Sequence, residues 1–120
     1  RKCIKLQVSV PSHCKLMAHA AHEFENFIRN IDLKLPKTEL IHNFNASSAA
    51  HINELQFNLL QQLTNPVQWV KTMEYLKQKN SIIIECGPGK VLTGIAKSNE
   101  LDSVISTSAD DHLEILKSLL

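Results

Sequence analysis

A short run of isoleucines followed by a glycine-rich turn constrains the fold of this chain most strongly. Residues 81–86 (SIIIEC) are mostly apolar without alternation, which is typical of a strand covered on both faces in a parallel sheet. Gly87-Pro88-Gly89 then turns the chain sharply, and residues 90–97 have the pattern of a short helix. A strand, a tight turn and a helix in this order predict a layered α/β architecture.

Strand patterns and helix patterns alternate along the rest of the 120 residues. Period-two alternation or short apolar runs predict the other strands, over residues 5–10, 39–44 and 103–107. Apolar side chains at three- and four-residue steps predict the other helices, over residues 13–31, 47–63, 67–79 and 109–120. Since no repeat or linker interrupts this alternation, residues 1–120 are expected to form one structural unit without a second domain.

Three of these helices are preceded by residues that favour helix starts. Ser12 is expected to cap the first helix, and Ser47 or Ser48 the second. The pair Asn65-Pro66 predicts a restart, in which asparagine caps a third helix and proline takes its first helical position.

Charge and composition exclude several functions. The chain has 13 Lys plus Arg against 12 Asp plus Glu and no basic stripe, so we expect no nucleic-acid partner. Its apolar runs are too short for a membrane span or a signal peptide, so we expect no membrane partner and a cytoplasmic location. The three cysteines lack a CxxC spacing, and the histidines His19 and His22 lie among charged residues. We therefore expect no metal site and no cofactor.

His13 is the first candidate for catalysis. It stands between a predicted strand and a predicted helix, where open α/β sheets place ligands and catalytic groups. The pattern alone favours a simpler interpretation, in which His13 only packs at the start of the helix. The pattern alone likewise predicts that Gln62 is a helix residue exposed to solvent.

Three segments of the chain change these interpretations. They are residues 8–14 (VSVPSHC), 61–69 (QQLTNPVQW) and 85–94 (ECGPGKVLTG). In this order they resemble three motifs of the malonyl-CoA:acyl carrier protein transacylase family. The resemblance implies the C-terminal part of an α/β-hydrolase-like acyltransferase core, with a mainly parallel sheet and flanking helices.

The resemblance also implies roles for single residues. His13 matches the catalytic base of the family, and the main-chain carbonyl of Gln62 matches the group that orients its ring. That carbonyl lies in the last turn of a predicted helix, where carbonyls lack intrahelical partners. Asn43 matches a position in the corresponding strand of the family, and Ser12 and Asn43 are both candidates for lining the cleft.

The implied function is malonyl-CoA:acyl carrier protein S-malonyltransferase, a transferase of fatty acid biosynthesis and lipid metabolism. Its ping-pong reaction passes through a serine ester, and its partners are malonyl-CoA and the phosphopantetheine thiol of acyl carrier protein. The 120 residues contain no serine between glycines at the G-x-S-x-G spacing. We therefore expect the nucleophile to come from an N-terminal remainder of the same enzyme, and this chain alone to be inactive.

Two other interpretations stay open. The acyltransferase domain of a polyketide or multifunctional synthase shares the implied architecture. A non-catalytic α/β interaction module that keeps the motif sequences belongs to a different class, and it predicts a chain that folds cooperatively as a monomer.

Overall fold

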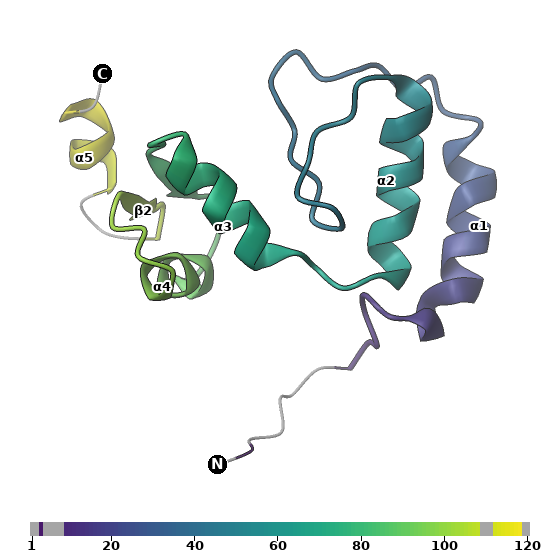
Figure 1. Ribbon diagram of the computed structural model, residues 1–120, viewed down its shortest axis with the longest axis horizontal. Coiled ribbons are helices and arrows are strands. Elements are labelled where there is room, and N and C mark those ends of the chain that lie inside the picture. Colours follow the sequence, from purple (N-terminus) through teal and green to yellow (C-terminus); the bar gives the residue numbers. More distant parts are fainter. Residues whose placement is uncertain (1–2, 4–8, 109–111, 119–120) are drawn as a thin grey trace. The chain divides into compact units, whose positions relative to one another are not determined.

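The computed structural model describes residue 3 and residues 9–108 and 112–118 (Figure 1). Packing divides the chain into two compact units, Arg1–Trp69 and Val70–Leu120. Most of the strand predicted over residues 5–10 lies outside the described residues. The expectation of a single structural unit stays a prediction.

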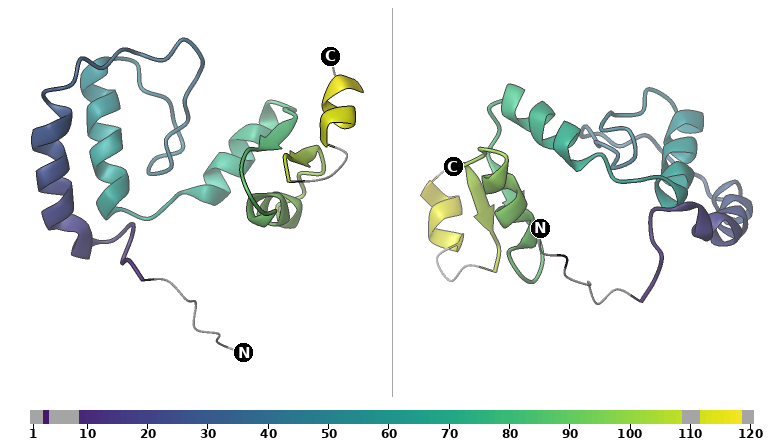
Figure 2. Two further views of the ribbon diagram at one scale, coloured as in Figure 1. Left: turned by 180° about the vertical axis from the view of Figure 1, so that it is seen from behind. Right: turned by 60° about the horizontal axis from the view of Figure 1, so that its bottom comes forward.

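Two helices dominate the first unit. A 3₁₀ turn, η1 (Lys15–Met17), leads into α1 (Ala18–Ile28), and α2 (Ile52–Thr64) follows a long loop. The helices α1 and α2 lie side by side and run in opposite directions (Figures 1 and 2). Ile28 and Leu55 are buried, with exposed fractions of 2% and 5%.

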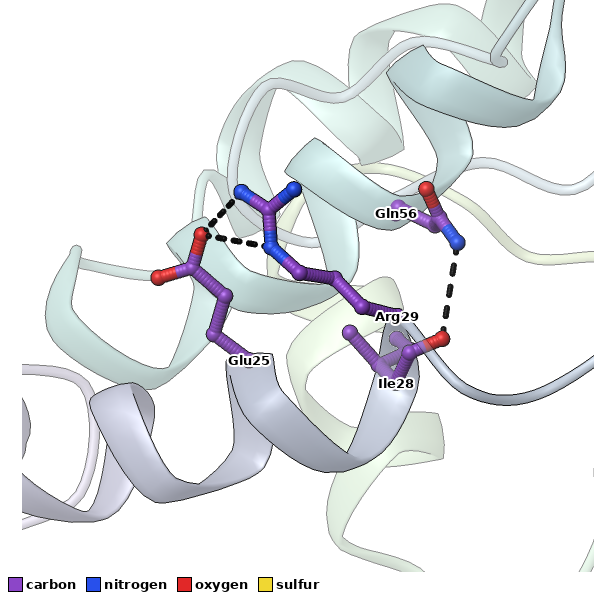
Figure 3. Close-up of polar contacts among 4 residues, drawn as sticks. All are labelled: Glu25, Ile28, Arg29 and Gln56. Atoms are coloured by element: carbon purple, nitrogen blue, oxygen red, sulfur yellow. Dashed lines mark hydrogen bonds and ion pairs between the residues drawn. The ribbon is translucent and has the colours of Figure 1, made fainter.

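A hydrogen bond joins the end of α1 to α2 (Figure 3). Gln56 donates a long hydrogen bond of 3.4 Å from Nε2 to the carbonyl oxygen of Ile28. The next residue, Arg29, donates from both Nε and Nη2 to the same carboxylate oxygen of Glu25, one turn earlier in α1. The Arg29 hydrogen bonds and charge hold the pKa of Glu25 below its usual value.

The predicted helix starts in this unit are wrong. The 3₁₀ turn begins after Cys14, whose backbone is extended, and Ser12 lies in the turn before it. The helix α2 begins after His51 instead of after Ser47 or Ser48. Its start is held by a group from inside the helix, since the Glu54 carboxylate accepts the Ala50 N–H at 2.8 Å.

Residues 39–44 do not form the predicted strand. A strand needs a neighbour for its backbone hydrogen bonds, and the described part of this unit contains no other strand. The backbone instead forms a turn, in which the His42 N–H bonds to Ser47 O and the Ala46 N–H bonds to His42 O. Ala46 takes a left-handed φ of 55° to close it.

The second unit contains the sheet. After α3 (Trp69–Gln78), whose first residue belongs to the first unit, come β1 (Ile83–Glu85), α4 (Val91–Ser98), β2 (Val104–Ser106) and α5 (His112–Ser118). The strands β1 and β2 pair in parallel, with Ile83 opposite Val104. The helices α4 and α5 flank them (Figure 2). The predicted α/β fold with a parallel sheet is confirmed, although Ile84 of β1 is 44% exposed instead of covered.

The turn between β1 and α4 depends on its glycines. Gly87 and Gly89 have φ angles of 131° and 91°, which side chains larger than hydrogen rarely allow. Ser108 donates from Oγ to Gly87 O at 2.7 Å, and Ser106 donates from Oγ to Gly89 O at 3.0 Å. The turn is therefore fastened to the end of β2.

Glu85, the last residue of β1, caps the helix α4. Its carboxylate accepts the N–H groups of Leu92 and Thr93 at 3.0 and 2.8 Å, and the Thr93 hydroxyl at 2.6 Å. These bonds, the Thr93 hydroxyl first, hold the pKa of Glu85 below its usual value. Sequence reasoning missed this role, because a cap is normally sought directly before the helix.

Candidate active site

His13 lies in a tight turn and not, as expected, in the first turn of a helix. Before His13, the Ser12 N–H donates a hydrogen bond to Val10 O. After it, the Met17 N–H donates one to Cys14 O. His13 itself has a left-handed φ of 60°. This conformation is uncommon for a residue other than glycine, and costs on the order of 1–3 kcal/mol where it is imposed. The surrounding contacts therefore hold His13 in place.

The ring of His13 is oriented by the main chain of α2. Its Nδ1 lies 2.6 Å from the carbonyl oxygen of Gln62, 49 residues further along the chain. Figure 1 shows the C-terminal end of α2 next to the turn that precedes η1. A carbonyl oxygen can only accept, so Nδ1 must carry the proton and, in a neutral ring, Nε2 carries the lone pair. The ring is therefore set to accept a proton at Nε2.

The position of Gln62 explains why its carbonyl is available. Gln62 is third from the end of α2, and the last four carbonyls of a helix have no partner within it. The C-terminal end of a helix also carries partial negative charge. Such a carbonyl can offset positive charge that the His13 ring acquires on taking a proton.

The other two predicted site residues are not brought into contact with the ring. Ser12 precedes His13 in the turn, and Asn43 is exposed in the loop before α2. The carbonyl oxygen of Asn43 accepts the Gln68 N–H at 2.6 Å. Within the described residues neither side chain bonds to His13. Their place in a cleft stays a prediction.

A buried histidine lies in the same loop. His42 is 3% exposed, and its Nε2 has no hydrogen-bond partner among the described residues. Burial, partly offset by the charge of Glu54, lowers its pKa. Sequence reasoning missed this burial, although the neighbouring Ile41 and Phe44 are a signal for it.

Other candidate chemistry is not supported in the described ranges. No cluster of three or more His, Cys, Asp or Glu there could hold a metal ion. His19 instead lies 3.8 Å from Glu23, and both side chains are exposed. None of the helices in these ranges combines the length and apolar character that crossing a membrane requires.

Comparison with known sequences shows which proteins the chain is similar to. The chain is 36% identical over 98 residues to the malonyl CoA-acyl carrier protein transacylase of Haemophilus influenzae, and 37% identical over 98 residues to that of Escherichia coli K12. Each match covers 81% of this chain. The same matches cover 31% and 32% of the two relatives, so the chain spans about a third of their length. No family model matches the chain.

Solved structures give the same result for the fold. The chain superposes on FabD from Acinetobacter baumannii with a TM-score of 0.88 at 36% identity, over 97% of this chain and 38% of that one. For the FabD of Xanthomonas oryzae the TM-score is 0.90 at 30% identity, over 99% and 38% of the two chains. A malonyl-transacylase in complex with a type II PKS acyl-carrier protein gives 0.77 at 29% identity, over 95% and 37%.

By sequence and by fold, this chain is similar to acyltransferases. Within that class, the resemblance carried by the three motifs is confirmed. The chain is similar to part of the malonyl CoA-acyl carrier protein transacylases, over most of its own length.

Proposed function

We propose that this chain supplies the base half of a malonyl-CoA:acyl carrier protein S-malonyltransferase, with His13 as the catalytic base. The observation that carries the proposal is the contact between His13 Nδ1 and Gln62 O, because it leaves Nε2 as the proton acceptor. The similarity to transacylases over 81% of the chain supports it. The serine nucleophile belongs to a polypeptide equivalent to the rest of those relatives.

In the first half-reaction the His13 Nε2 takes the proton of the serine hydroxyl. The serine oxygen attacks the thioester carbonyl of malonyl-CoA, the carbon–sulfur bond breaks, and the CoA sulfur takes the proton from His13. The products are a malonyl-serine ester and CoA. In the second half-reaction the carrier-protein thiol gives its proton to His13, and its sulfur attacks the ester. The serine oxygen leaves and recovers the proton.

The Gln62 carbonyl has one function in both half-reactions. It holds the Nδ1 proton, so the same nitrogen, Nε2, gains and loses a proton each time. An aspartate does this in a Ser-His-Asp triad. A neutral carbonyl at a helix end takes its place here, and the partial charge of α2 supplies part of the missing negative charge.

The carrier protein and the location are part of the same proposal. We infer that the acyl carrier protein serves fatty acid synthesis in the cytoplasm. A polyketide carrier protein is the second candidate, because one structural neighbour at 29% identity is bound to a type II PKS acyl-carrier protein. The proposed chemistry is the same for both.

A chimera tests the function. The 120 residues replace the matching third of the Escherichia coli relative, which then supplies the serine. We expect transfer of malonate from malonyl-CoA to acyl carrier protein. The His13→Asn chimera should be slower by about 10²–10⁴-fold, the usual contribution of a general base. Asparagine is the matched control because it tolerates a left-handed φ, so the backbone of the turn is retained.

Two results contradict the proposal. The first is a folded His13→Asn chimera that transfers malonate at the parent rate. The second is a stable malonyl adduct on the 120-residue chain alone, which would place a nucleophile within it. If the full exchange does not fold, residues 8–14 and 61–69 alone are grafted into the relative and the same pair is compared.

A further inference from the structure

Two neighbouring carbonyls at the end of α2 have different partners. The oxygen of Gln61 accepts two hydrogen bonds from Asn65, at 3.0 Å from its N–H and at 2.9 Å from its side-chain Nδ2. The oxygen of Gln62 accepts the His13 ring at 2.6 Å. A carbonyl oxygen has two lone pairs, so the oxygen of Gln61 already accepts as many hydrogen bonds as it can. The oxygen of Gln62 accepts none of these bonds and can accept one from His13.

Pro66 accounts for the open carbonyl. In a continuing helix, the oxygen of Gln62 would accept the N–H of the residue four positions later. That residue is Pro66, which has no N–H. Proline also drives the preceding residue out of the helical region, and Asn65 has an extended backbone with φ −117° and ψ 151°. The chain therefore turns away, and the end of the helix stays accessible.

We propose that Pro66 is a positioning residue for His13, acting through the carbonyl of Gln62. It withholds the one backbone donor that would compete for this oxygen. It also keeps the next turn of backbone away from the path of the imidazole. The catalytic consequence rests on the proposed function of His13, whereas the effect on the ring does not.

The strained turn increases the need for such a device. His13 is exposed and has a left-handed backbone, so local interactions alone hold its ring weakly. The bond to Gln62 spans 49 residues of sequence. A competing donor at position 66 would weaken the long-range contact that fixes the ring. Pro66 itself is exposed, so packing does not account for it.

The test compares two replacements that differ in one N–H group. Pro66→Ala introduces a backbone donor. Replacement of Pro66 by N-methylalanine, introduced by semisynthesis, has the same side chain but no donor, and it still disfavours a helical preceding residue. Nitrogen NMR of the His13 ring in the full chain reports which nitrogen carries the proton. We expect a single Nδ1–H form with proline and N-methylalanine, and loss of that form with alanine.

The same pair in the chimera gives the catalytic readout. Pro66→Ala should lower kcat about fivefold without changing KM, as expected for weakening one hydrogen bond. N-methylalanine should restore kcat. A purely structural role for Pro66 predicts that both replacements behave alike, and an unchanged Nδ1–H signal with alanine overturns the proposal.

The two proposals fail separately. If the tautomer responds as expected but His13→Asn does not impair transfer, then Pro66 positions the ring and His13 is not the base. If His13→Asn abolishes transfer and the tautomer of the His13 ring stays the same when Pro66 is replaced by alanine, then only the positioning proposal is wrong. Should the alanine chain not fold by itself, the ring is observed in the chimera instead.

Discussion

The imidazole Nδ1 of His13 and the main-chain oxygen of Gln62 lie 2.6 Å apart, although 49 residues separate them in sequence. The histidine lies in a strained turn, and the carbonyl belongs to the last turn of α2. This contact joins the segment before α1 to the end of α2. It also determines which ring nitrogen is free to take a proton.

The side chain of Gln62 should be dispensable. The hydrogen bond to His13 comes from the carbonyl of Gln62, which alanine retains, so Gln62→Ala should change kcat of the chimera by no more than about twofold. Steady-state kinetics with malonyl-CoA measure this. His13→Asn in the same background is the positive control for loss. A Gln62→Ala variant as slow as His13→Asn would show that the side chain, and not the carbonyl, orients the ring.

The left-handed backbone of His13 makes a prediction about stability. His13→Gly and His13→Ala both remove the ring and its bond to Gln62, but only glycine adopts a φ of 60° without strain. The glycine variant should have the larger free energy of unfolding, by about 1 kcal/mol. Urea unfolding followed by circular dichroism measures the difference. Equal stabilities, or a more stable alanine variant, would contradict the strained turn.

The cap of α4 makes a prediction about acid. The pKa of the Glu85 carboxyl is lowered in the folded chain from an ordinary value of 4.5, so the unfolded chain takes up the proton first. The stability that Glu85 contributes is therefore present above pH 4.5, and is lost as the pH falls through the lower folded value. Unfolding measured from about pH 7 down to about pH 3 should show a smaller acid dependence in Glu85→Gln.

Thr93 provides the control for this cap. Thr93→Val removes the hydroxyl that contributes most to the lowered pKa of Glu85, and should lower Tm by about 4 °C. Thr93→Ser keeps the hydroxyl and should lie close to the parent. Other carboxyls with lowered pKa values, Glu25 and Glu100, retain their acid dependence in every variant. If Glu85→Gln leaves the acid profile unchanged, the cap does not operate in solution.

The sheet was predictable because its signals are local. An unalternating isoleucine run predicted β1, and the glycines at positions 87 and 89 predicted the turn that follows. Helix starts were less predictable, since the groups that hold them do not stand directly before the helix. Glu54 lies in the first turn of α2, and its carboxylate accepts an N–H from the residues before the helix. The carboxylate of Glu85 reaches α4 from the other side of the Gly-Pro-Gly turn. Neither of these two contacts can be predicted from the spacing of residues in the sequence alone.

The site was predictable only in part, and for a similar reason. A histidine can be recognised by its residue type, and a family motif pointed to Gln62. The availability of the carbonyl depends on where α2 ends, and the pattern placed that end at residue 63, next to the observed end at Thr64, although it misplaced the start of the helix. The strand predicted over residues 39–44 failed because pairing requires a neighbour that the described part of this unit lacks. The left-handed φ of His13 has no sequence signal.

The His13 ring is held by a main-chain carbonyl. The position of that carbonyl depends on the number of residues in the helix and not on their types. Each residue of an α-helix turns the backbone by about 100° and advances it by about 1.5 Å. A single insertion or deletion within α2 would therefore rotate the carbonyl at position 62 away from His13, while side-chain replacements leave it in place. Selection that maintains the orientation of the His13 ring can therefore act on the length of α2 more than on the composition of its last turn.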